Sequence, residues 1–392
     1  MSLLTVLVLV LILAFATGSH SLFYLAYVSV ALVIGSRLWI ARTLGGLRLE
    51  RHMPLRAFCG ERVDVSLRVT NTWRLPVLWL YLHESLPIAL HTPNFVRQIV
   101  SLAPRESVQV NYALECGQRG FFELGPLALQ TGDFFGLAPD MHAHGPTQRF
   151  VVYPRIVPLP RLQMPSNTAF GYLPVHAKLF QDPNRFFGVR DYQRGDSLRT
   201  VHWTSSARLS RLQVKRFEPA VALRCMIVLD LNATNYHLGS SAAAEELGCT
   251  LAASIAARLT ELRQAMGVAI LAKDQLSELV GLQTIPVGQG RDHLILILEA
   301  LAKARMAPTT PITDWLPQAA SGLGWGSTVI LITAGDSVGL LASIVNLQRR
   351  GANVVVIATD SRKPFAALKG QLENIGVPAY WITSEKELGR WP

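Results

Sequence analysis

The chain has 392 residues, of which 50% are hydrophobic and 16% charged, and its formal net charge is +10. This length exceeds what one hydrophobic core usually covers, and the composition is too apolar for a disordered chain and too polar for a transporter with many spans. The charge is compatible with nucleic acid, but the sequence carries no nucleic-acid recognition signature, so we do not expect that partner. The length and composition together predict folded domains tethered to a membrane.

Two apolar runs open the chain, at residues 3–17 and 22–41, on either side of a break at Gly18–Ser21. They predict a transmembrane helical hairpin over residues 1–46, although the first run is short for a span. A secretory signal peptide is the alternative for that run, which lacks a basic n-region. Four arginines lie at the end of the second run and after it, at Arg37, Arg42, Arg48 and Arg51. The positive-inside rule therefore predicts a plasma-membrane protein whose soluble domains are cytoplasmic.

Four cysteines stand far apart, without a CxxC pair, at Cys59, Cys116, Cys225 and Cys249. This spacing argues against a zinc knuckle or a redox motif. We interpret them as buried thiols in a reducing compartment. A Cys59–Cys116 disulfide is the alternative if that part of the chain faces outward.

Residues 47–155 show short stretches of alternating polarity, at 63–69, 78–82 and 108–112, with turn signals between them. The pattern predicts an all-β sandwich of antiparallel strands of the immunoglobulin-like kind. From residue 223 to 392 strand patterns alternate with helix patterns: strands at 224–229, 267–272, 327–333, 353–358 and 379–383, and helices at 241–264, 292–305, 338–350 and 365–375. This order predicts an α/β, Rossmann-like, doubly wound domain.

A densely charged linker, residues 156–222, joins these two domains. Gly195 and Asp196 predict a turn and a helix cap, followed by a helix with one apolar face. That face comprises Leu198, Val201, Leu209 and Leu212.

The linker also carries a motif that closely resembles the signature of the domain-of-unknown-function family fifty-eight (DUF58). Its residues are Arg190, Asp191, Tyr192, Gly195, Asp196, Arg199, His202, Trp203 and Arg208. Upstream, the stretches 119–127 and 133–137 resemble a second recurrent stretch of that family. The resemblance implies a von Willebrand A-like domain and, as partners, a MoxR-type AAA+ ATPase or a transglutaminase-like membrane protein, but no reaction.

In von Willebrand A-like domains a divalent cation lies at the carboxyl end of the first strand, held by hard oxygen ligands. The resemblance therefore implies a Mg²⁺ site at Asp230, Asn232 and Thr234, with Asp336 reaching in from a later loop, where the family pattern has an acidic residue at the position of Ala334. The alternative is that Asp230 and Asn232 only shape the turn after the strand. Both interpretations stay open at this point.

The arginines of the linker can serve either as a partner-binding face or as an ion-pair network that locks the two domains together. The sequence has no GxxxxGK[ST], HExxH or GxSxG motif, which argues against the enzymes those motifs mark. We therefore expect a membrane-anchored scaffold or adaptor that binds a protein partner. A metal-dependent enzyme using Asp230 and Asp336, and a purely structural membrane protein, are the alternatives.

Overall fold

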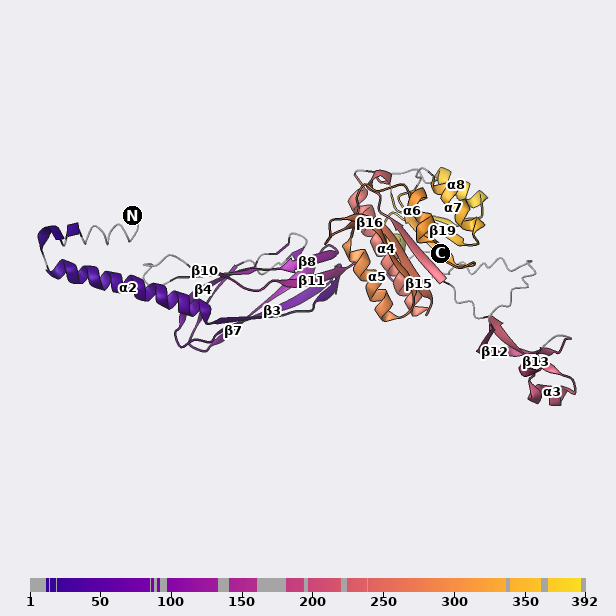
Figure 1. Ribbon diagram of the computed structural model, residues 1–392, viewed down its shortest axis with the longest axis horizontal. Helices are drawn as coiled ribbons and strands as arrows, with labels where there is room; N and C mark the ends of the chain where they lie inside the picture. Colours follow the sequence, from indigo (N-terminus) through magenta and orange to yellow (C-terminus); the bar gives the residue numbers. More distant parts are fainter. Residues whose placement is uncertain are drawn as a thin grey trace.

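The computed structural model describes residues 12–388 except 14, 19, 85, 88–89, 92–96, 133–140, 161–180, 194–196, 220–223, 238, 336–338 and 361–365. In Figure 1 the chain passes from an N-terminal helix through a β-rich part to a part built of strands and helices. A small unit made of β12, β13 and α3 stands beside the latter.

The N-terminal helix is α2 (His20–Gly45), a 26-residue helix that contains the second predicted span. Among the described residues it is the one helix long and apolar enough to cross a membrane, and 11% of its most apolar stretch is buried. A core helix of a soluble protein is largely buried instead, so this exposure favours contact with lipid. The first predicted span, 3–17, lies mostly outside the described residues; within it, 12–13 and 15–17 are helical.

The β-rich part consists of three small sheets around one core. The first contains β1 (Leu47–His52), β3 (Arg62–Asn71), β7 (Ser107–Cys116) and β5 (Leu90–His91). The second contains β10 (Met141–His144), β9 (Leu127–Thr131), β4 (Val77–Glu84) and β6 (Arg97–Leu102). The third contains β2 (Arg56–Phe58), β11 (Gln148–Tyr153) and β8 (Gly120–Leu124). The three predicted alternating stretches are confirmed as parts of β3, β4 and β7, whose inward side chains fill the core.

One pairing departs from the predicted antiparallel pattern, because β2 runs parallel to β11. These strands lie far apart in the sequence, so no tight hairpin forces them to be antiparallel. All four cysteines are free thiols, and Cys59 and Cys116 do not form the alternative disulfide. Burial raises the pKa of Cys116 to about 11, as expected for a thiol held in an apolar interior.

The C-terminal part contains a mixed sheet with the order β16, β15, β14, β18, β19, β20. Its strands are β14 (Arg224–Asp230), β15 (Ala265–Asp274), β16 (Val280–Gly288), β18 (Thr328–Thr333), β19 (Asn353–Ala358) and β20 (Ala379–Trp381). Neighbours from β15 to β20 are parallel, as predicted, while β16 is antiparallel to β15. A two-residue strand, β17 (Ala304–Arg305), also pairs with β15.

Helices cover both faces of this sheet. Alternate residues of β14 face two different cores, with Ile227 and Leu229 in one and Met226 and Val228 in the other. The first core is closed by α4 (Ser241–Glu261), α5 (Arg291–Lys303) and α9 (Glu385–Leu388). The second is closed by α6 (Ile312–Ala319), α7 (Leu340–Arg349) and α8 (Ala366–Asn374). A strand buried on both faces reads as a continuous apolar run, and β14 does so.

The charged segment does not form the single amphipathic helix that we predicted. It forms a hairpin, β12 (Gln181–Asp191) and β13 (Gln213–Pro219), with a short 3-10 helix η1 (Leu198–Thr200) and the helix α3 (Trp203–Leu209) between the strands. Val201 is extended and bridges to Val214, and the His202 amide donates to the Gln213 carbonyl at 2.8 Å. These cross-chain bonds compete with helical bonds at the same residues, so the helix is interrupted there.

Candidate functional site

Asp230 ends β14 at the carboxyl edge of the parallel sheet and is fully buried. Its Oδ1 accepts a hydrogen bond from the Asn232 amide at 3.1 Å. Its Oδ2 accepts from Asn235 Nδ2 at 3.0 Å and from Thr333 Oγ1 at 3.3 Å, so both carboxylate oxygens already face donors. The carboxylate thereby ties the loop after β14 to the end of β18.

The Asn232 side chain also makes several hydrogen bonds to neighbouring residues. Its Oδ1 accepts from the amide and hydroxyl of Thr234, at 3.2 and 2.9 Å, and from the Thr309 amide at 3.1 Å. Its Nδ2 donates to the Thr309 carbonyl at 3.2 Å. The side chain therefore joins the loop after β14 to the loop before α6, as a structural turn residue does.

Asp360 is a second buried carboxylate at this edge, two residues beyond the end of β19, and sequence reasoning missed it. Its Oδ2 accepts from the His237 amide at 2.8 Å and its Oδ1 from Ser240 Oγ at 2.7 Å. Ser240 is the N-cap of α4, so the carboxylate lies close to the positive end of that helix. An acidic residue two positions after a buried parallel strand was the signal that could have identified it.

The predicted cation ligands Asp230 and Asn232 act as hydrogen-bond acceptors within the described part of the protein. A divalent cation needs several oxygens with free lone pairs directed at one point, whereas the oxygens of Asp230 and Asn232 have N–H and O–H donors directed at them. No group of three acidic, His or Cys side chains suited to a metal occurs in the described part of the chain. Asp336 lies outside it. The geometry favours the turn-shaping interpretation, and Mg²⁺ binding stays a prediction.

The hairpin with η1 and α3, hereafter the signature unit (residues 188–215), contains the remaining predicted residues; Gly195 and Asp196 lie outside the described ones. Among its described residues, the buried ones are two valines, Val201 and Val214, and two polar residues, Ser206 and Gln213. Gln213 is buried and donates through Nε2 to Asp191, while its amide donates to Ser206 Oγ at 2.8 Å. The His202 imidazole caps α3 by accepting from the Ser205 amide at 3.2 Å through Nδ1. The histidine is thus structural, and it fixes where α3 begins.

Other predicted residues of the unit lie along its strands and surface. Arg190 Nη1 donates to the Asp191 carbonyl at 3.1 Å, and the Tyr192 amide donates to the Leu212 carbonyl at 2.9 Å. Arg199 and Arg208 are exposed, and Arg211 pairs with Asp191 at 3.4 Å. These side chains give the outside of the unit a positive charge.

Large apolar side chains are exposed on this small unit. The exposed fractions are 62% for Leu198, 67% for Trp203, 51% for Leu209 and 41% for Leu212. Three of these four were predicted to form one apolar helix face with Val201, and of that predicted face only Val201 is buried. The unit thus leaves most of its large apolar side chains exposed, and exposed apolar patches typically mark interaction sites.

The junction between the β-rich part and the α/β part depends on Arg119, which sequence reasoning singled out only as part of a recurrent stretch. Its guanidinium, 0% exposed, enters the α/β part and donates to the carbonyls of Leu301 and Ala304 at 3.1 and 2.8 Å. It also pairs with Glu245 at 2.7 Å and with Glu246. These described contacts join the two parts through residues outside the charged linker, for which an interdomain ion-pair network was one of our two interpretations.

Comparison with known proteins agrees with the family resemblance. Residues 188–324, from β12 to the loop before β18, match the family described as "Protein of unknown function DUF58". The upstream stretch that contains Arg119 lies outside this match. The chain is also 23% identical over 306 residues to "Uncharacterized protein YeaD" of Bacillus subtilis (strain 168), which covers 76% of this chain and 72% of that protein.

Solved structures resemble only parts of the chain. Native alpha-2-macroglobulin from Escherichia coli, from domain MG7 to the C-terminus, is 19% identical over 28% of this chain and 17% of its own, with a TM-score of 0.25. Proximal thread matrix protein 1 from the mussel byssus is 15% identical over 43% of this chain and 45% of its own, with a TM-score of 0.32. The chain thus spans less than half the length of either structure.

Proposed function

We propose that this protein is a membrane-anchored adaptor whose signature unit binds a protein partner. The observation that carries the proposal is the exposure of Leu198, Trp203, Leu209 and Leu212 on one small folded unit. Full burial of an exposed side chain of this kind contributes about 1.5–3 kcal/mol, and each of these four partly exposed side chains contributes a fraction of that on binding. Tryptophan and arginine dominate the energetics of many interfaces, and Trp203 has Arg199 and Arg208 close by in the sequence.

The unit is organised before any partner arrives. The bonds of Gln213, His202 and Ser206 hold α3 against β13 without using the exposed side chains. Preorganised surfaces lose less conformational entropy on binding. The positive outer charge favours a partner whose binding surface is acidic around an apolar groove.

The proposed anchor is α2, with the soluble parts in the cytoplasm. Arg37, Arg42 and Arg48 follow its most apolar stretch, as the positive-inside rule requires of a cytoplasmic flank. Arg51 contributes less than we predicted, because it is buried and pairs with Glu84 at 2.5 Å inside the β-rich part.

The family resemblance suggests which kind of domain the α/β part is and which partner it binds. It suggests that the α/β part is a von Willebrand A-like domain and that the partner is a MoxR-type AAA+ ATPase, with a transglutaminase-like membrane protein as the other candidate. A metal-dependent enzyme centred on Asp230 is less well supported, because its carboxylate oxygens accept protein hydrogen bonds. A purely structural role does not explain why these large apolar side chains are exposed.

The test is binding of a purified MoxR-type ATPase to the full chain in detergent. We expect the Trp203→Ala/Leu209→Ala variant to keep its melting temperature and to bind at least about tenfold more weakly, since two apolar anchors are lost. Ile99→Ala is the matched control, because Ile99 is 68% exposed on β6, away from the unit. Equal binding by the double variant and the control would refute the proposal.

A further inference from the structure

β16 is the edge strand of the sheet in the α/β part, since its one strand neighbour among the described residues is β15. Figure 1 places it at the margin of the sheet, on the side of α5. An edge strand leaves every second backbone N–H and C=O without an interstrand partner. Which residues carry these groups follows from the register.

The Asp274 amide donates to the Leu279 carbonyl at 2.9 Å, and the same register continues along the hairpin. Hydrogen-bonded pairs alternate in an antiparallel ladder. Gly281, Gln283 and Ile285 therefore direct their backbone groups inward to β15. Val280, Leu282 and Thr284 direct theirs outward. The register shifts beyond Ile285, and Pro286 there has no N–H to offer.

Pro286 and a shift in register protect one end of this edge, whereas the stretch from Val280 to Thr284 lacks such protection. Natural edges are blocked by charges, prolines, bulges or a covering element. Between Leu279 and Gly288 the sequence contains no charged residue, and Leu279 and Val280 are 71% and 49% exposed. Pro286 limits the available row to the three residues before it. A strand added here gains backbone hydrogen bonds along a short, defined stretch.

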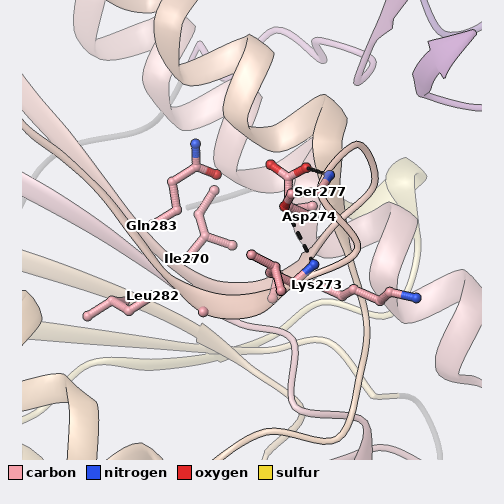
Figure 2. A pocket seen from close by; sticks show the side chains of 10 residues that line it. Ile270, Lys273, Asp274, Ser277, Leu282 and Gln283 are labelled. Atoms are coloured by element: carbon pink, nitrogen blue, oxygen red, sulfur yellow. Dashed lines mark hydrogen bonds between the residues drawn. The ribbon is translucent and has the colours of Figure 1, made fainter.

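A hollow of about 300 Å³ lies on the α5 face of the same two strands. Cross-strand pairs that share this face line it: Ile270 with Gln283, and Ala272 with Gly281. Figure 2 shows Gln283 and Ile270 side by side, with Asp274 and Ser277 at the turn. A Cβ on Gly281 would meet no atom within 4 Å, so the floor of the hollow is open at that point.

We propose that the β16 edge binds an extended segment of a partner protein by strand addition, with one long apolar side chain of that segment in the hollow. This recognition mode obtains affinity from backbone bonds and specificity from pockets for alternate side chains. A second copy of this chain fits less well. If two copies paired through their β16 edges with Leu282 opposite Leu282, the residues of the second copy beside the hollow would be Gly281 and Gln283. Neither residue has a long apolar side chain.

The site is separate from the signature unit and does not depend on the adaptor proposal. The probes are acetylated nine-residue peptides of alternating Thr and Val with a central Leu, Phe or Asp, measured by fluorescence polarisation with the full chain in detergent. We expect the Leu and Phe peptides to bind and the Asp peptide and a backbone N-methylated Leu peptide not to bind.

Two variants test the backbone and the hollow separately. Thr284→Pro removes one outward N–H without breaking a bond to β15, and Thr284→Val is its matched control. Gly281→Leu fills the hollow. We expect wild-type binding for Thr284→Val, at least about tenfold weaker binding for the other two, and unchanged melting temperatures.

Three results would overturn the proposal: no peptide binding to the wild type, equal binding to Thr284→Pro, or a dimer that forms with concentration and is lost in Thr284→Pro. The last result would assign the edge to a second copy.

Discussion

Replacing Arg119 with alanine should loosen the junction between the two soluble parts. The guanidinium is 0% exposed and serves two backbone carbonyls and two glutamates. Its removal leaves the carbonyls of Leu301 and Ala304 buried without this donor and leaves Glu245 and Glu246 with Arg305, at 3.5 and 3.7 Å. Removal of one partner from a buried ion pair costs about 3–5 kcal/mol. We expect a loss of stability of that size.

Urea denaturation of the full chain in detergent, followed by tryptophan fluorescence, measures this loss. Limited proteolysis should also cut the variant earlier near the junction, because the two parts separate more often. Arg149→Ala is the control: its side chain is 88% exposed and 3.8 Å from Glu123, and exposed pairs contribute about 0–1 kcal/mol. A loss below about 1 kcal/mol for Arg119→Ala would refute the assignment of the junction to this residue.

Gly120→Ala should destabilise the protein by about 1–3 kcal/mol, because φ at Gly120 is +152° and a Cβ there would lie 2.9 Å from side-chain atoms of Arg305 and Gln275. Gly60→Ala is the control in thermal melts: φ at Gly60 is +90°, but no atom lies within 4 Å of an added Cβ, so this variant carries backbone strain without crowding. Asp230→Ala should lower the free energy of unfolding by about 1–3 kcal/mol, because the donors Asn235 and Thr333 lose their acceptor. Calorimetric titration of Mg²⁺ into the wild type should give no heat of binding. A heat of binding that disappears in Asp230→Ala would instead support the magnesium prediction. Burial raises the pKa of Cys116 from 9.0 to about 11, so the folded state holds its proton longer than the unfolded chain. Its contribution to stability is present below pH 9 and is lost as the pH rises toward 11; melts of wild type and Cys116→Ser across this range should converge with rising pH.

The sequence by itself determined the local elements. Apolar alternation located β3, β4 and β7, and the strand–helix order after residue 223 located β14, β18 and β19 together with α4 and α5. The apolar run at 22–41 located α2. These features follow from periodicity within a short window, which depends only on which residues meet the core or the lipid.

Tertiary structure decided what long-range contacts control. In the segment around Val201, pairing with Val214 replaced the helix that local spacing favoured, and it turned Leu198, Leu209 and Leu212 outward. Asp230 accepts a hydrogen bond from the nearby Asn235, but its other side-chain donor, Thr333, lies on β18, 103 residues later in the chain. Arg119 reads as one surface arginine among many until the β-rich part meets the α/β part and buries it. Spacing along the chain predicts which side chains share a face, but whether that face is covered depends on elements brought from elsewhere, because burial is a property of the assembled surfaces.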